Sequence, residues 1–122
     1  DWNCFLSLFS EGATLSAVVQ GDSGKFERLI MTPESYIEQS GSNLERDGFH
    51  EVEFHRITEE FGQIAHAFSS YESRRTQRDS SPFARGINSF QLMHDGERWW
   101  IVSIYWQSEG PDNMIPAKYG GS

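Results

Sequence analysis

The chain has 122 residues, of which 37% are hydrophobic and 14% aromatic, and it carries a formal net charge of −8. This length suits one globular domain with a single core. The acidic balance argues against a general binder of nucleic acid or of anionic membranes. The single cysteine, Cys4, excludes an internal disulfide and a cysteine-based zinc cluster. With no apolar run near the about 20 residues that span a bilayer and no signal-peptide pattern, a cytoplasmic location is expected.

The N-terminal part of the chain predicts one helix and two short strands. A helix is expected over residues 2–9, because four apolar side chains follow the spacing of one helix face: Trp2, Phe5, Leu6 and Phe9. Residues 13–20 and 26–30 then favour strands on either side of the turn sequence GDSG. The chain begins inside the first helix pattern, so an upstream segment is expected to precede it.

The sequence MTPES predicts the start of a second helix. Thr32 is suited to cap the helix, and Pro33 fits the first helical position, where its missing N–H costs nothing. The helix is expected to run to about Arg46 and to stop near Gly48.

The rest of the domain reads as strands. Four extended segments are predicted, with a strong hairpin signal at Asp95-Gly96 between the last two: residues 49–58, 62–75, 86–94 and 98–108. Helices that precede a long antiparallel meander predict an α+β domain, in which a curved antiparallel sheet wraps around the N-terminal helices. This single domain is expected over residues 1–109, with residues 110–122 as a C-terminal tail.

Pairing the strands from their turns divides the side chains between two faces. The last hairpin predicts four pairs: Met93–Trp99, Gln91–Ile101, Ser89–Ser103 and Ile87–Tyr105. In the first hairpin, one register places three residues, Val52, Phe54 and Arg56, on the face of Ala65, Ala67, Ser69, Tyr71 and Ser73. This face mixes small, hydroxyl and aromatic side chains, as a ligand pocket does. The predicted ligand-binding residues are Val52, Phe54, Ser69, Tyr71, Ser89, Gln91, Trp99, Ser103 and Tyr105.

The opposite face of the last hairpin is apolar. Exposed on a monomer, it would form a patch larger than soluble proteins usually tolerate. A homodimer made sheet against sheet is therefore expected, and its predicted interface residues are Phe90, Leu92, Trp100, Ile104 and Trp106.

Four segments carry a resemblance to a known superfamily: DWNCFLSLFSEGATL, MTPESYIEQ, FGQIAHAFSSYESRR and RGINSFQLMHDGERWWIVSIYW. Over residues 1–109 the chain resembles the NTF2-like superfamily, which includes nuclear transport factor 2, ketosteroid isomerase, scytalone dehydratase and SnoaL-type polyketide cyclases. It is most similar to the SnoaL-like/DUF4440 group of small bacterial proteins. The resemblance implies a cone-shaped α+β fold and a longer N-terminal helix, which in several enzymes supplies a pocket acid or tyrosine. It does not imply one activity, because the fold hosts many.

The chemistry of the predicted pocket is incomplete. Its predicted face has hydroxyl and amide groups but no carboxylate, and an enolising or dehydrating enzyme needs a base near the proton. His55 and His66 are predicted cross-strand neighbours near Glu53. They could ligate a metal or act as acid and base, but a solvated outer face is the favoured interpretation, so no metal site is predicted. Four arginines of the 74–85 region could bind an anion or simply face solvent: Arg74, Arg75, Arg78 and Arg85.

Two functions remain open on the sequence. In the first, the domain binds a small apolar or aromatic molecule and, if catalytic, performs isomerisation, cyclisation or dehydration without a cofactor. In the second, it is a non-catalytic association or ligand-binding module. No catalytic residue can be assigned from the sequence.

Overall fold

The computed structural model describes residues 1–121, in which six strands form one curved sheet. The strand order is β2-β1-β6-β5-β4-β3; β1 and β6 run parallel, and all other neighbours are antiparallel. The strands are β1 (Phe9–Gln20), β2 (Phe26–Met31), β3 (His50–Phe61), β4 (Ile64–Arg74), β5 (Ala84–His94) and β6 (Trp99–Ser108). The predicted α+β class and the predicted strands are confirmed.

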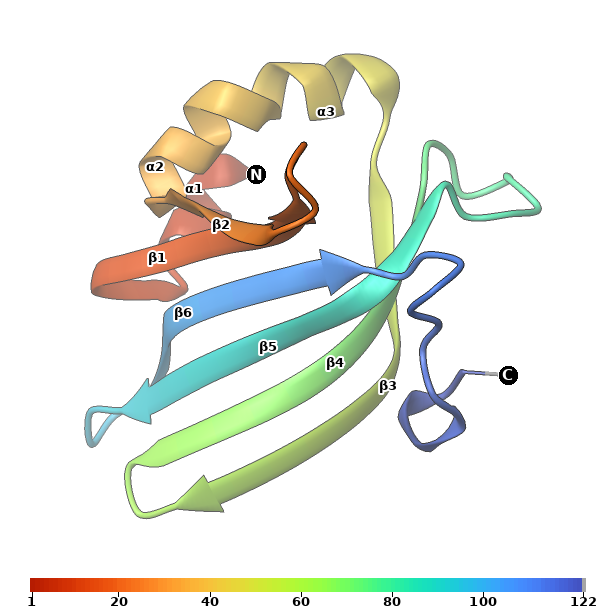
Figure 1. Cartoon of the computed structure of the whole chain (residues 1–122). Helices are drawn as coiled ribbons and strands as arrows, with labels where there is room; N and C mark the ends of the chain where they lie inside the picture. Colours follow the sequence, from red (N-terminus) through yellow and green to blue (C-terminus); the bar gives the residue numbers. More distant parts are fainter. Residues whose placement is uncertain (122) are drawn as a thin grey trace.

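Two helical segments gather near β1 and β2 (Figure 1). They are α1 (Trp2–Leu6) and the continuous run of α2 (Pro33–Tyr36), η1 (Ile37–Gly41) and α3 (Ser42–Asp47). The short η2 (Ala117–Tyr119) lies instead against β3 and β4. No helix of residues 1–121 is both long enough and apolar enough to cross a membrane.

A reciprocal cap fixes the start of α2, as the sequence predicts. The Thr32 hydroxyl accepts a hydrogen bond from the Ser35 N–H at 3.0 Å, and the Ser35 hydroxyl accepts one from the Thr32 N–H at 2.9 Å. Pro33 occupies the first turn. Because both donors would otherwise lack partners at a helix start, the cap sets where the run begins.

The first helix is shorter than predicted. It ends at Leu6, and Phe9 already belongs to β1, where it pairs with Ile101 of β6. The Phe5 and Phe9 rings nevertheless lie 5.0 Å apart. Both side chains therefore reach the core, which explains why the apolar spacing extended beyond the helix.

The core lies between the helices and the face of the sheet that they cover, which we call the inner face. Phe9, Ala13 and Leu15 of β1 are buried there. Around them pack five partly buried residues: Phe5, Tyr36, Ile101, Ile104 and Trp106. Contacts between aromatic rings connect α1 through α2 to β6, with Phe5–Tyr36 centroids at 5.8 Å and Tyr36–Trp106 centroids at 6.3 Å.

A bulge changes the pairing of β5 and β6. The structure pairs His94 with Trp99, whereas beyond the bulge Ser89 pairs with Tyr105, which leaves Val102 as the extra residue of β6. All four predicted pairs are therefore wrong, by one residue beside the turn and by two beyond the bulge. A shift of one residue changes the face and a shift of two restores it. The observed pairs include Leu92–Ile101, Gln91–Ser103, Phe90–Ile104 and Asn88–Trp106.

A second bulge lies in β3. Glu53 pairs with Tyr71, and His55 pairs with Ser70, so Phe54 is the extra residue. The predicted placement of Arg56 with Ser69, Tyr71 and Ser73 is confirmed, but Val52 and Phe54 do not share that face. Because paired antiparallel residues share a face, the inner face of β3 instead carries Glu51 and Glu53, which pair with Ser73 and Tyr71.

Residues 110–121 fold back across the opposite, outer face of the sheet (Figure 1). The Ser70 hydroxyl donates to the Tyr119 carbonyl at 2.7 Å, and the Ile115 N–H donates to Oε2 of Glu109 at 3.0 Å. Ile115 is buried, and the Tyr119 ring meets the Phe68 ring edge-on at 5.3 Å. The C-terminal segment therefore covers part of the outer face.

Candidate functional site

A cavity of about 460 Å³ opens on the inner face, between the helices and strands β3 to β6. This volume lies in the range of pockets that hold small molecules. Aromatic side chains form most of its wall: Trp2, Phe5, Phe9, Tyr36, Phe49, Tyr71, Phe83, Phe90 and Trp106. Trp2 is held at the rim by a hydrogen bond from its Nε1 to Oε1 of Glu45 in α3, at 2.7 Å.

A few polar groups interrupt this apolar wall. Glu51 and Ser73 line the cavity opposite each other across β3 and β4, and Asn88 lines it from β5. The Asn88 side-chain amide, which is buried, donates to Oε2 of Glu51 at a long 3.4 Å. A mostly apolar pocket with a small number of polar groups is the usual composition of a binding site.

Glu51 has a carboxylate that is easier to protonate than usual. Its side chain as a whole is exposed, but its carboxylate is drawn in among the cavity walls, and this loss of water raises its pKa; the Asn88 amide lowers the pKa by a smaller amount. A desolvated carboxylate holds a proton more strongly, as an acid–base catalyst at neutral pH requires.

Two tyrosine hydroxyls belong to the same site. Burial raises the pKa of Tyr71 and that of Tyr36, and the negative charge of Glu51 raises both further. In Tyr71 a hydrogen bond with Ser108 partly opposes this effect. Both phenols therefore stay protonated over the physiological range and can donate hydrogen bonds to a ligand.

The position of Tyr71 depends on a glycine beneath it. A Cβ on Gly86 would lie 2.6 Å from the Tyr71 hydroxyl and 2.3 Å from the Gln107 carbonyl oxygen. The hydroxyl lies 3.3 Å from Oγ of Ser108. Gly86 thus provides the space in which the buried phenol sits.

The structure divides the predicted ligand-binding residues between both faces. Tyr71 lines the inner cavity. Ser69 shares its face but donates its hydroxyl to Glu53. Trp99 lies at the open end of the inner face, exposed, with its ring 5.0 Å from that of His94. The outer face carries the others: Val52, Phe54, Ser89, Gln91, Ser103 and Tyr105.

The predicted interface residues are divided in the same way. Phe90, Ile104 and Trp106 line the inner cavity, and Leu92 shares their face. Their predicted outward orientation is therefore wrong, because the helices pack on this face. Trp100 lies on the outer face near the turn, where its Nε1 donates to Asp95 at 2.7 Å and the Arg98 guanidinium stacks 3.3 Å from its ring centre.

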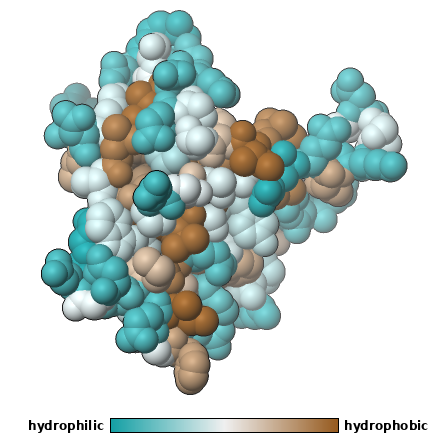
Figure 2. Space-filling view, turned by 90° about the vertical axis from the view of Figure 1, so that its left-hand side faces the viewer, coloured by the Kyte–Doolittle hydropathy of each residue, from teal (hydrophilic) through white to brown (hydrophobic). Residues whose placement is uncertain are grey.

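Apolar side chains still reach the surface where the hairpins turn. Phe61, which is 83% exposed, and Ile64 lie at the β3–β4 turn, and Met93 lies beside the β5–β6 turn. Figure 2 views this side of the molecule and shows small hydrophobic areas separated by hydrophilic residues. Phe61, Ile64 and Met93 are not among the predicted interface residues.

Sequence reasoning missed three residues of the cavity. Glu51, Asn88 and Tyr36 line the cavity but are not among the predicted site residues. The bulge at Phe54 places Glu51 on the inner face, and the two-residue register change pairs Asn88 with Trp106. The periodicity of the helix from Pro33 gave the only sequence signal for Tyr36.

The histidines and arginines form no shared site. His66 faces Glu59, with Nε2 and Oε1 at 2.8 Å, whereas His55 pairs with Ser70, so the predicted neighbours are apart. In residues 1–121 no group of three or more histidine, cysteine or acidic side chains is placed to hold a metal ion.

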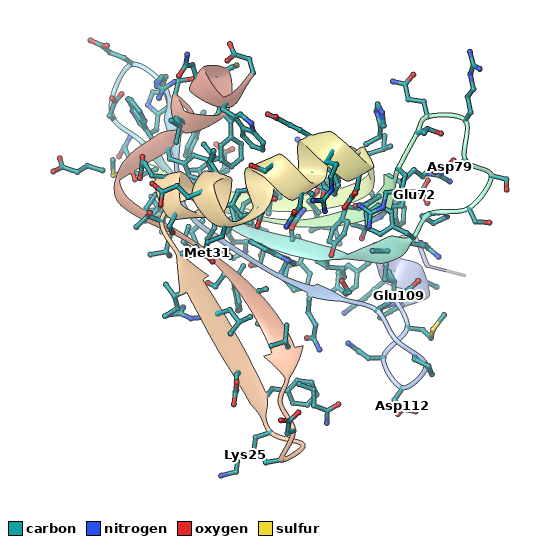
Figure 3. The ribbon with its side chains drawn as sticks, turned by 90° about the horizontal axis from the view of Figure 1, so that it is seen from above. Lys25, Met31, Glu72, Asp79, Glu109 and Asp112 are labelled. Carbon is teal, nitrogen blue, oxygen red and sulfur yellow. The ribbon has the colours of Figure 1, made fainter. Side chains whose placement is uncertain are left out.

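Carboxylates neutralise two of the four arginines. Arg74 contacts Glu72 at 2.6 Å, and Arg85 lies between Glu72 and Glu109, at 3.9 and 3.4 Å. Figure 3 shows Glu72 and Glu109 at the same end of the sheet. An anion site that uses all four arginines is therefore not assembled in this structure.

Comparison with known proteins identifies the fold. No protein-family model matches the sequence, and no curated protein is significantly similar to it. The structure is similar to a protein of unknown function with a cystatin-like fold from Nostoc punctiforme, with a TM-score of 0.69 and 13% identity over 91% of this chain and 78% of that one.

Two further structures agree. An NTF2-like protein of unknown function from Pseudomonas putida has a TM-score of 0.67 at 10% identity, over 95% of this chain and 80% of that one. The beta subunit of benzoate 1,2-dioxygenase from Burkholderia mallei has a TM-score of 0.63 at 15% identity, over 97% of this chain and 83% of that one. The chain therefore has the NTF2-like fold, with a curved sheet of six strands and helices on its inner face.

Proposed function

We propose that the chain binds a small, largely apolar cyclic molecule in the inner-face cavity, and that Glu51 transfers a proton there without a cofactor. The observation that carries this proposal is the Glu51 carboxylate, which has a raised pKa inside a cavity walled by aromatic rings. Such a carboxylate is the base that the sequence alone did not provide.

The composition of the cavity supports a ring-shaped ligand with one polar end. The aromatic wall offers flat apolar surface, with Trp106 and Phe90 on the sheet and Phe5 on the helix side. The polar side chains of Glu51 and Asn88 would orient a single carbonyl or hydroxyl group of the ligand. A bulky charged ligand would gain nothing from most of this surface.

The reaction that fits best is the shift of a double bond in an unsaturated ketone. Glu51 would remove a proton from the carbon between the carbonyl and the double bond, and the C–H electron pair would move into an enolate. The Tyr36 or Tyr71 hydroxyl would donate a hydrogen bond to the enolate oxygen. Protonated Glu51 would then return the proton to the far carbon of the former double bond, so that atoms and charge balance.

The SnoaL-like resemblance is compatible with this chemistry, since SnoaL-type cyclases also act on ring compounds without a cofactor. The alternative is a non-catalytic association module. Homodimer formation stays a prediction, which sedimentation of the unsubstituted chain can test. Three of its five predicted interface residues line the cavity instead, and this favours the ligand-binding proposal.

The test is the isomerisation of 3-cyclohexen-1-one to its conjugated isomer, followed by ultraviolet absorbance. We expect Glu51→Gln to lower the rate by about 10²- to 10⁴-fold, as loss of a general base does. The matched control is Glu59→Gln, which removes a carboxylate from the outer face. Equal rates in the parent and Glu51→Gln would contradict the assignment of the base. The parent chain could fail to isomerise this ketone and still bind a cyclic compound near Trp106. That result would support the proposed binding site and contradict the proposed reaction.

A further inference from the structure

A second hollow, of about 320 Å³, lies on the outer face beneath the C-terminal segment. Strands β4, β5 and β6 form its floor, and residues 113–116 and Tyr119 form its cover. It lies on the opposite face of the sheet from the inner cavity, and Trp106 borders both hollows. It contains Ser89 and Tyr105, two of the predicted ligand-binding residues.

Three side chains define a slot in this hollow. Phe68 of β4 pairs with Ser89 of β5, which pairs with Tyr105 of β6, so all three stand in one row on the outer face. Two strand spacings separate the outer members by about 9.6 Å. The small serine between them leaves the space above it open.

The width of this slot suits one flat ring. Carbon atoms in contact lie about 3.5–4.0 Å apart, so a ring stacked between two others needs about 7–8 Å between their planes. The backbone spacing of Phe68 and Tyr105 therefore matches the room that one intervening ring needs, and it is too small for two. The Ser89 hydroxyl lies at the bottom, and Gln107 and Asn113 supply polar groups at the edge.

Hydrogen bonds and an aromatic contact hold the C-terminal segment in place over the slot. The Ser70 hydroxyl holds the Tyr119 carbonyl, Glu109 holds the Ile115 N–H, and the Tyr119 ring supports Phe68. Despite this cover, Phe68 and Tyr105 remain 40% and 45% exposed. Aromatic surface left open inside a formed hollow indicates room for a ligand.

The charges near the slot indicate a neutral ligand. Glu109 is the acidic residue in its lining, and it already contacts Arg85 and the Ile115 N–H. We therefore propose that this outer-face slot is a second binding site, which takes a neutral flat aromatic or heteroaromatic molecule between Phe68 and Tyr105. This site is independent of the proposed function of the inner cavity.

The test uses indole as the probe and two-dimensional amide NMR spectra of the whole chain. We expect indole to bind with a Kd of about 1 mM or tighter, and to shift the Ser89 backbone amide and the Gln107 side-chain amide. Ser89→Phe should fill the slot and abolish these shifts. Gln91→Phe is the matched control, because it adds the same ring to the same strand and face but outside this hollow.

A second variant removes one wall without filling the slot. Tyr105→Ala should weaken indole binding about tenfold or more, and Asn88→Ala, in the inner cavity, should leave it unchanged. The proposal is overturned if indole shifts neither amide in the parent chain, or if Ser89→Phe still binds indole. It is equally overturned if Asn88→Ala abolishes the binding, because the ligand would then occupy the inner cavity.

Discussion

The Tyr71 hydroxyl lies directly over Gly86, at a point where a Cβ would come within 2.6 Å of it. The same Cβ would lie 2.3 Å from the Gln107 carbonyl oxygen, which belongs to the backbone and cannot rotate away. The position of a cavity phenol is thus linked to the absence of a side chain on the neighbouring strand.

We predict that Gly86→Ala destabilises the fold and displaces Tyr71. Overpacking of this kind costs about 2–3 kcal/mol, which lowers Tm by roughly 10 °C in a domain of this size. Gly110→Ala is the control, since a Cβ there meets nothing within 4 Å. Thermal unfolding followed by circular dichroism measures both, and equal Tm values for the two variants would show that Gly86 is not tightly enclosed.

Glu51 and Glu53 should have opposite effects on the pH dependence of stability. The pKa of Glu51 is raised on folding, so its contribution to stability is present at low pH and is lost as the pH rises through its folded pKa. Glu51→Gln should therefore gain stability relative to the parent as the pH rises from about 4 to about 7.

The pKa of Glu53 is lowered, first by its bond to Arg56 and also by Ser69. Its contribution is present at neutral pH and is lost as the pH falls. Glu53→Gln should thus be less stable than the parent near neutral pH, by no more than about 1 kcal/mol for a partly exposed pair, and the difference should shrink in acid. Urea unfolding at both pH values measures the two slopes, and slopes of the same sign would contradict the placement of Glu51.

The attachment of the C-terminal segment depends on a buried hydroxyl. Ser70 is fully buried and donates to the Tyr119 carbonyl. Ser70→Ala leaves that carbonyl without its partner and should cost about 1–2 kcal/mol. Trypsin should then cleave this variant faster after the exposed Lys118. The control variant Ser81→Ala, which changes an exposed loop, should be cleaved at the same rate as the parent. Unchanged cleavage of Ser70→Ala would mean that this bond does not hold the segment.

The cap of α2 gives a prediction that the sequence already suggested. Thr32→Ala removes the acceptor for the Ser35 N–H and should lower the free energy of unfolding by about 1 kcal/mol. Thr32→Ser keeps a hydroxyl at the same place and should restore most of it. Chemical denaturation distinguishes the two, and equal losses would show that the methyl group of Thr32 matters more than its hydroxyl.

Local signals in the sequence were enough to predict the fold class, the six strands and the helix that begins at Pro33. Each depends on residues close together in the chain: alternation in the strands, the Thr32 cap, and the turn at Asp95-Gly96. The NTF2-like resemblance agreed with these signals, and the structural comparisons confirm the fold.

The candidate site could not be predicted, because it depends on the bulges and on which face of the sheet the helices cover. The extra residues Phe54 and Val102 change which side chains share a face, and neither residue type marks a bulge in the sequence. The bulge at Phe54 places Glu51 on the inner face. Trp106 shares a face with Phe90 and Ile104 in either register, and only the packing of the helices shows that this face is the inner one. Tyr71 lines the inner cavity, and its role as a ligand-binding residue stays a prediction.

We propose that the ligand binds on the inner face, beside Trp2 and Trp106. The most direct test is a titration with 2-naphthol, an apolar fused ring with one hydroxyl, followed through the indole N–H signals of the tryptophans in NMR spectra. We predict that the Trp2 and Trp106 signals shift together with saturation, because Trp2 lines the inner cavity whereas Trp106 also borders the outer hollow. These shifts should weaken in Asn88→Ala, while the exposed Trp99 signal stays in place. A saturable shift at Trp99 with none at Trp2 would contradict this placement of the site.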